Sequence, residues 1–142
     1  ASISCRKLFL IDACHSGAGS EEYASSQLSG ERMNQLTSGQ KGLSLMMSCR
    51  ANEFSYEDDQ WQNGAFTQAM LHTIEQFTRR VPGIDLNQDG ALDIKELYTH
   101  LEKEVPKLVQ NKRPKPQTSQ QPLLVSDPLS SPIVLFQLPK NK

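Results

Sequence analysis

Lys7-Leu8-Phe9-Leu10-Ile11-Asp12-Ala13-Cys14-His15-Ser16-Gly17 is the stretch that decides the fold of this chain. The apolar run from Leu8 to Ile11 predicts a fully buried strand of a parallel sheet. The run stops at an acidic residue and a cysteine, and the glycine that follows lets the backbone turn away tightly. Because chemistry in open α/β sheets gathers at the carboxyl ends of the strands, Cys14 is placed for attack on a substrate. The alternative is that Cys14 is a small buried side chain that only packs.

The composition of the chain narrows its class of function. Its 142 residues correspond to one domain or part of one, and 15 basic against 16 acidic residues give a net charge of -1. This small net charge creates no strong positive electrostatic field that would attract a nucleic acid or an anionic membrane. No apolar run approaches the ~20 residues that cross a bilayer. Three cysteines without metal-type spacing indicate free thiols in a reducing compartment, so we expect a cytoplasmic protein.

A second apolar run, at residues 42–48, predicts the neighbouring buried parallel strand. Residues 49–57 would then form a loop at the same sheet edge as Cys14. Residues 20–41 between the two strands are polar and lack periodicity, which predicts a long loop. Loops of this length are usually functional or disordered.

Two helices and two short strands are predicted after the loop. The first helix covers residues 63–80, with Asn63 as its N-cap. Its apolar stripe consists of Phe66, Met70, Ile74 and Phe77. The second helix covers residues 94–105 and ends at Pro106. A polar surface loop to residue 122 and strands at 123–125 and 133–136 complete the prediction.

Residues 10–17 resemble the nucleophile strand of caspase-like cysteine peptidases, in the branch of metacaspases, paracaspases and bacterial orthocaspases. That branch has Asp-x-Cys where the aspartate-cutting caspases have Gln-Ala-Cys. Residues 49–57 resemble the caspase substrate loop, and Asn63-Gly64-Ala65-Phe66-Thr67 resembles the start of the helix after that loop. The resemblance implies an α/β fold of the caspase-hemoglobinase type, with a mostly parallel sheet flanked by helices.

The resemblance also implies that residues 1–142 are the C-terminal part of one caspase-like domain, because the nucleophile already stands at position 14. In the family, further strands and a histidine that acts as the base come before it. We therefore expect the N-terminal portion of the same domain to be a partner that supplies this histidine. Residues 20–41 correspond to the linker that caspases cleave on activation, with Arg32 and Lys41 as candidate autocleavage sites. The alternative for this segment is an ordinary surface loop.

The reaction that the resemblance implies is acyl transfer, with Cys14 as the nucleophile. A thiolate attacks whereas a thiol does not, so Cys14 needs a base. His15 is its neighbour, but adjacent side chains of an extended chain point to opposite faces, so the base is assigned to the N-terminal portion. The expected partners are proteins with basic cleavage sites, and neither a nucleic acid nor a membrane is expected.

The specificity pocket is where the sequence departs from the aspartate-cutting caspases. Their pocket uses Gln two residues before the cysteine and Arg at the end of the substrate loop; these positions hold Asp12 and Glu57 here. Carboxylates pair with guanidinium through two hydrogen bonds and with ammonium more simply, so we predict cleavage after Arg in preference to Lys. Ser48, Ser55 and Tyr56 are further candidate substrate-binding residues. The alternative for Asp12 is a turn former at the strand end.

Residues 85–96 match the pattern of an EF-hand calcium loop. The candidate ligands are Asp85, Asn87, Asp89, Ala91, Asp93 and Glu96. Two features argue against a working site: Pro82-Gly83 interrupts the entering helix, and the usual second loop is absent from the sequence. The alternative is that Asp93 and Glu96 form a capping box at the start of the next helix. Calcium is therefore an optional ligand, and no cofactor is required for the predicted reaction.

Two functions compete with the peptidase. The first is a catalytically inactive caspase-like scaffold, since the base is not visible in this chain. The second is a calcium-sensing regulatory subunit built on residues 85–96. The intact Asp-x-Cys motif together with an acidic pocket favours the enzyme, because a scaffold has no need of both.

Overall fold

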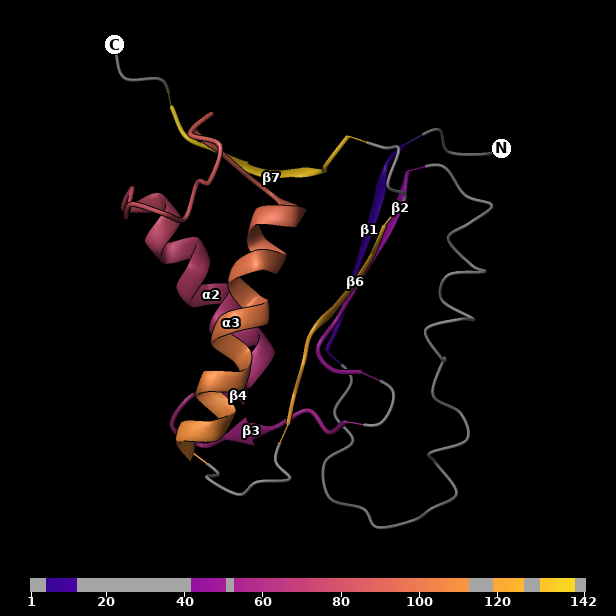
Figure 1. Cartoon of the computed structure of the whole chain (residues 1–142), viewed down its shortest axis with the longest axis vertical. Helices are drawn as coiled ribbons and strands as arrows, with labels where there is room; N and C mark the ends of the chain where they lie inside the picture. Colours follow the sequence, from indigo (N-terminus) through magenta and orange to yellow (C-terminus); the bar gives the residue numbers. More distant parts are fainter. Residues whose placement is uncertain (1–4, 13–41, 51–52, 113–118, 127–130, 140–142) are drawn as a thin grey trace.

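The computed structural model describes residues 5–12, 42–50, 53–112, 119–126 and 131–139. Two helices, α2 and α3, lie on one side of a three-stranded sheet, and the C-terminal strand runs across one end of the molecule (Figure 1). The fold is therefore of the predicted α/β class, with both described helices on the same face of the sheet.

The three-stranded sheet consists of β1 (Lys7–Ile11), β2 (Leu43–Met47) and β6 (Leu123–Ser126), in the order β1-β2-β6. β1 and β2 are parallel, as predicted, while β6 is antiparallel to β2. The last residues of the parallel pair, Ile11 and Met47, lie opposite each other. The Ser48 N–H donates to the Ile11 carbonyl at 3.0 Å. The residues that follow β1 and β2 therefore begin at the same edge of the sheet.

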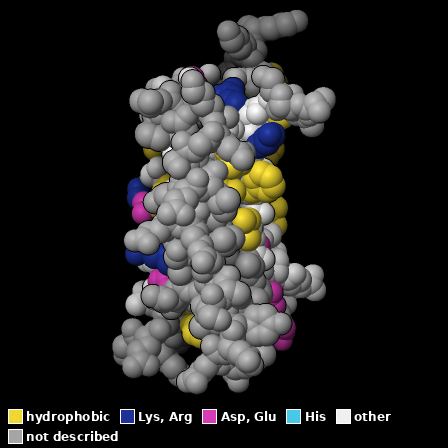
Figure 2. Space-filling model, turned by 90° about the vertical axis from the view of Figure 1, so that its right-hand side faces the viewer, with side chains coloured by type: hydrophobic (Ala, Val, Ile, Leu, Met, Phe, Trp, Pro, Cys, Tyr) yellow, Lys and Arg dark blue, Asp and Glu magenta, His cyan; other side chains and the backbone are white. Residues whose placement is uncertain are grey.

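The strand β1 is less buried than the sequence predicted. Phe9 is 52% exposed and Leu10 46% exposed, so the expectation of a fully buried strand is wrong for the described residues. The reason is its place in the sheet: among the described strands, only β2 pairs with β1. Figure 2 views the molecule from the side on which the sheet lies, and described hydrophobic side chains are visible at that surface.

The helix α2 (Ala65–Thr78) begins later than predicted. Its N-cap is Gly64, which makes no side-chain capping bond, so the assignment of Asn63 as N-cap is wrong. The reason is that Asn63 belongs to a small hairpin. In this hairpin β3 (Glu57–Asp58) pairs with β4 (Asn63–Gly64). Within the predicted stripe, Phe66 and Phe77 are buried, and the other two residues pack against the core while partly exposed.

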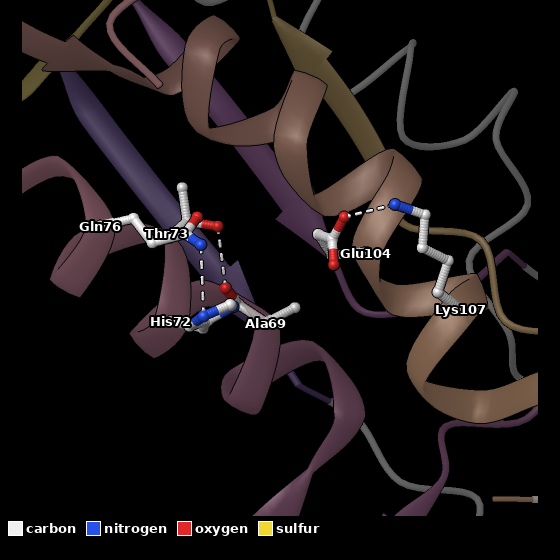
Figure 3. A network of polar contacts seen from close by, with 6 residues as sticks. All are labelled: Ala69, His72, Thr73, Gln76, Glu104 and Lys107. Atoms are coloured by element: carbon white, nitrogen blue, oxygen red, sulfur yellow. Dashed lines mark hydrogen bonds and ion pairs between the residues drawn. The ribbon is translucent and has the colours of Figure 1, made fainter. Parts of the chain in front are cut away.

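The helix α3 (Ile94–Lys112) continues through Pro106, so the predicted helix end and the loop that was to follow it are both wrong at this point. Proline removes one backbone hydrogen bond, but Val105 and Val109 on either side of it are buried and hold the helix against the core. Figure 3 shows the polar contacts of the two helices: Lys107 pairs with Glu104 on α3, and two bonds within α2 join Thr73 to the Ala69 carbonyl and Gln76 to His72.

The two remaining strands lie together at one end of the molecule. β5 (Ala91–Asp93) pairs with β7 (Val134–Gln137) in an antiparallel ladder. Arg6, just before β1, donates to the carbonyls of Ser131 and Pro132 at 3.1 and 2.9 Å and so connects the segment before β7 to the sheet. Within the described ranges, neither helix has both the length and the apolar character that crossing a membrane requires.

Candidate active site

The Asp12 carboxylate comes directly after β1 and is held by two hydroxyl groups. Ser55 Oγ donates to Asp12 Oδ1 at 3.3 Å, and Thr67 Oγ1 donates to Oδ2 at 2.5 Å. Thr67 lies in the first turn of α2, where the positive end of the helix dipole favours a negative charge. Asp12 itself is exposed to solvent. Each carboxylate oxygen therefore has a fixed donor, while the group stays open to a cation from outside.

The Asp12 carboxylate approaches Gly64 closely. Gly64 is buried, and a Cβ built on it would lie 3.2 Å from Asp12 Oδ2 and 3.5 Å from Oδ1. Its φ of -75° is ordinary for any residue. The close approach of the carboxylate, and not the backbone conformation, therefore favours glycine here.

Glu57 lies on the same face of the β3–β4 hairpin as Asp12. Glu57 is directly opposite Gly64 in the antiparallel pair. Opposite positions point to the same face, with Cβ atoms about 4.5–5.5 Å apart. Because the Asp12 carboxylate oxygens lie 3.2 and 3.5 Å from where a Gly64 Cβ would stand, both side chains belong to this face. Asp12 and Glu57 are both exposed.

The other three predicted pocket residues meet at one buried side chain, the amide of Gln120. Its Nε2 donates to the Ser48 carbonyl at 3.0 Å and to Ser55 Oγ at 3.4 Å. Its Oε1 accepts from the Tyr56 N–H at 2.9 Å. The Tyr56 side chain packs partly buried against the main core. The Ser55 hydroxyl therefore links this amide to Asp12, while Ser48 and Tyr56 bind the amide through backbone groups.

The Glu53 side chain also holds the loop after β2 in place through hydrogen bonds. Its carboxylate accepts from the Arg50 N–H at 3.2 Å and from the Gln121 N–H at 2.7 Å. It also accepts from Ser119 Oγ at 2.8 Å. The loop after β2 is thus joined to the segment that leads into β6.

Sequence reasoning missed Thr67, Gly64, Gln120 and Glu53 as site residues. The Gly-Ala-Phe-Thr segment was recognised only as the start of a helix, although it places two of these residues against Asp12. Gln120 and Glu53 stand in segments predicted as loops, and no pattern in their neighbours indicates a buried frame.

Cys49 follows β2 at the same edge as Asp12, close enough for the Asp12 charge to act on its thiol. Burial raises the pKa of Cys49. The hydrogen bond with the Ser48 side chain lowers this pKa in part, and the nearby carboxylates of Glu53 and Asp12 raise it. The Cys49 Sγ donates to the Glu53 carbonyl at 3.5 Å. A thiol with a raised pKa remains protonated near neutral pH, so Cys49 is unsuited to act as a nucleophile.

Several predicted residues lie outside the described residues, namely the nucleophile Cys14 and the autocleavage candidates Arg32 and Lys41. The described histidines make other contacts: His72 pairs with Gln76, and His100 contacts the Ile84 carbonyl. Neither contact involves the groups that hold Asp12.

The loop at residues 85–96 forms the predicted capping box. Asp93 Oδ1 accepts from the Glu96 N–H at 3.0 Å, and Glu96 Oε2 accepts from the Asp93 N–H at 3.1 Å. Glu96 Oε1 also accepts from the N–H groups of Leu86 and Asn87. Gly90 makes the sharp turn with φ +78°.

The other calcium candidates of this loop bind its own backbone. Asp85 accepts from the Asp89 and Gly90 N–H groups, Asn87 accepts from the Asp89 N–H, and Asp89 accepts from the Ala91 N–H. Within the part of the chain that the structure describes, no group of three or more His, Cys, Asp or Glu side chains is arranged to hold a metal ion. Calcium binding by this loop stays a prediction.

Comparison with known proteins gives one family. Residues 3–133 match the family model described as the caspase domain. No curated protein matches the chain.

Proposed function

Because the chain belongs to the caspase-domain family of cysteine peptidases, we propose that it forms an endopeptidase that cleaves after Arg, and less efficiently after Lys. The observation that carries the proposal is the Asp12 carboxylate, held by Ser55 and Thr67 on the same face as Glu57. Asp12 stands two residues before Cys14. Two residues of chain span at most about 7 Å, which supports placing the carboxylate and the thiol in one site.

The charge of the pocket sets the preferred substrate. A carboxylate accepts two parallel hydrogen bonds from guanidinium, whereas an ammonium group acts as a point charge. Both oxygens of Asp12 are oriented by hydroxyl donors, which suits the two-bond geometry of Arg. A substrate aspartate would face the like charges of Asp12 and Glu57, at a cost of several kcal/mol.

The proposed chemistry is acyl transfer at Cys14. The Cys14 thiolate attacks the carbonyl carbon of the basic residue, and the peptide nitrogen leaves as an amine after it has taken a proton. Water then hydrolyses the thioester and returns the free thiol. The base is a histidine of the N-terminal portion of the domain, and the Cys14 N–H helps to stabilise the oxyanion. Arg32 and Lys41 carry side chains that this pocket would accept, so cleavage of the segment 20–41 by the enzyme itself belongs to the proposal.

Covalent labelling tests the proposal. The protein that contains this chain together with the N-terminal portion is treated with a short peptide that ends in Arg and carries a thiol-reactive carbonyl group. Mass spectrometry is expected to place the label on Cys14, and the same peptide ending in Asp is expected to label it at least about 100-fold more slowly, as several kcal/mol of repulsion requires. Equal labelling by both peptides would contradict the pocket, and absence of labelling by either would contradict the enzyme.

A further inference from the structure

We propose that Gln120 is a positioning residue for the specificity pocket: its amide fixes the direction of a hydrogen-bonded chain that runs through Ser55 to the Asp12 carboxylate. The inference rests on the proposed function, because it concerns how the pocket for the basic residue is held. Gln120 is 0% exposed and precedes β6, far along the sequence from β1.

The partners of Gln120 permit only one orientation of its amide. The Tyr56 N–H is a donor and must meet the amide oxygen, which it does at 2.9 Å. The Ser48 carbonyl is an acceptor and must meet the amide nitrogen, which it does at 3.0 Å. A flipped amide would place donor against donor and acceptor against acceptor at a buried position, so the orientation is fixed by the backbone.

The fixed amide in turn directs the Ser55 hydroxyl. The Gln120 nitrogen also reaches Ser55 Oγ at 3.4 Å, and because it is only a donor, Ser55 must accept this bond. A serine hydroxyl has a single proton, which is then free to point at Asp12 Oδ1, 3.3 Å away. Ser55 is 3% exposed, so water does not compete freely for this proton. The chain of bonds therefore runs from Gln120 to Ser55 to Asp12 in one direction.

The hydrogen bond from Ser55 to Asp12 is expected to favour cleavage after Arg over cleavage after Lys. Guanidinium is planar and forms two parallel hydrogen bonds only when both carboxylate oxygens lie in its own plane. An ammonium group needs only the negative charge nearby. Without the Ser55 bond, Asp12 would keep its charge and its bond from Thr67, but Oδ1 would lose its fixed donor. Cleavage after Arg is then expected to fall more than cleavage after Lys.

The test compares kcat and KM for two peptides that differ only in Arg or Lys before the cut, with the protein that contains this chain and the N-terminal portion. Ser55→Ala removes the link and leaves the Gln120 bonds to the backbone. Gln120→Glu replaces the amide nitrogen by an oxygen, so Ser55 would donate to residue 120 in place of Asp12. Each variant is expected to lower the Arg-to-Lys ratio of kcat/KM about five- to tenfold, as the loss of one hydrogen bond to a charged group predicts.

Thr73→Ala is the matched control, because the Thr73 hydroxyl is also buried but bonds only to the Ala69 carbonyl within α2 (Figure 3). Its Arg-to-Lys ratio is expected to stay unchanged. The double variant of Ser55 and Gln120 is expected to lose no more selectivity than the stronger single variant, since both act on one link.

The outcomes separate this inference from the proposed function. A wild type that cleaves after Arg, with an unchanged ratio in Ser55→Ala, overturns the inference and leaves the function. A wild type that cleaves after neither Arg nor Lys overturns both. The buried charge of Gln120→Glu could prevent folding, which circular dichroism would reveal. In that case the Arg-to-Lys ratios of Ser55→Ala and Thr73→Ala are still compared, and equal ratios overturn the inference.

Discussion

The Asp12 carboxylate approaches Gly64 closely: a Cβ at residue 64 would lie 3.2 Å from Asp12 Oδ2. This relationship joins the end of β1 to the start of α2. Gly64 is the N-cap before the helix and makes no side-chain cap. Ser, Thr, Asn or Asp would stabilise the helix more at this position, but each would place a Cβ close to the Asp12 carboxylate.

Gly64→Ala is therefore expected to displace Asp12 while leaving the fold in place. The backbone at residue 64, with φ -75° and ψ 156°, accepts alanine without strain. The methyl group would push the carboxylate by a few tenths of an ångström, and we expect kcat/KM for Arg peptides to fall about tenfold, since misplacement by 1 Å can cost 100-fold. The measurement is peptide cleavage well below the melting temperature, with circular dichroism to verify folding. Wild-type kinetics in a folded variant would show that the close approach has no role.

The Thr67 hydroxyl is expected to contribute to catalytic efficiency through Asp12. Thr67→Val keeps the shape of the side chain and removes the donor to Asp12 Oδ2. A hydrogen bond to a charged group contributes about 1.5–3 kcal/mol, which predicts a loss of roughly 10- to 100-fold in kcat/KM for Arg peptides.

Thr99→Val serves as the matched control for Thr67→Val, because the Thr99 hydroxyl bonds only to the Lys95 carbonyl of its own helix. Its cleavage rate is expected to match the wild type. If Thr67→Val and Thr99→Val have equal kinetics, the Thr67 bond to Asp12 is not part of substrate binding.

Cys49 is expected to be dispensable for catalysis in spite of its place at the same sheet edge. Because burial raises its pKa, iodoacetamide near neutral pH should modify the exposed Cys5 before Cys49, as peptide mass spectrometry would reveal. Cys49→Ser should keep kcat/KM within about twofold, because surroundings of this kind do not activate a thiol.

The raised pKa of Cys49 also predicts how stability depends on pH. The folded chain holds this proton more tightly than the unfolded chain, so the contribution is present at neutral pH and is lost as the pH rises above the ordinary thiol pKa of about 8.5. Urea unfolding of the wild type and Cys49→Ser between pH 7 and pH 10 measures this difference.

Preferential alkylation of Cys49 in the iodoacetamide experiment, or loss of peptide cleavage in Cys49→Ser, would contradict the structural role of Cys49.

Glu96 is expected to stabilise the fold without any metal. It is 5% exposed and accepts from the N–H groups of Leu86, Asn87 and Asp93. Glu96→Ala leaves these donors without their acceptor, which is expected to lower the free energy of unfolding by about 2–3 kcal/mol in EDTA. The exposed Glu102→Ala is the control, and equal unfolding midpoints for the two variants would contradict the prediction.

A calcium titration of wild type and Asp85→Ala by calorimetry then separates the two roles of residues 85–96. Heat that is present in the wild type and lost in Asp85→Ala identifies a calcium loop. Absence of heat in the wild type leaves the capping box as the only role of Asp93 and Glu96.

The parts of this molecule that follow from local pattern were predictable. The apolar runs of β1 and β2 predicted a parallel pair, and the pair predicted that Asp12 and the loop after residue 48 share an edge. The bond between Ser55 and Asp12 confirms that reasoning. The capping box of Asp93 and Glu96 was likewise confirmed, because a cap depends on a spacing of three residues.

The parts that depend on distant partners were not predictable. The two-residue strands β3 and β4 have no periodicity, yet Gly64 in β4 and Thr67 in the first turn of α2 both lie against Asp12. Gln120 follows a polar, proline-rich segment, and its burial depends on backbone groups far away in the sequence. Likewise Pro106 predicted a helix end on local grounds, while burial on both sides of it keeps α3 continuous.

The central claim is that the negative charge of Asp12 selects basic residues, and a peptide panel with Arg, Lys or Asp before the cut tests it most directly. We expect the wild type to cleave the Arg peptide fastest. We also expect Asp12→Asn, which keeps the shape and removes the charge, to lose about 100- to 1000-fold in kcat/KM for Arg, as predicted for one partner of a hydrogen-bonded charge pair. Cleavage of the Asp peptide by the wild type, or unchanged Arg cleavage by Asp12→Asn, would contradict the account.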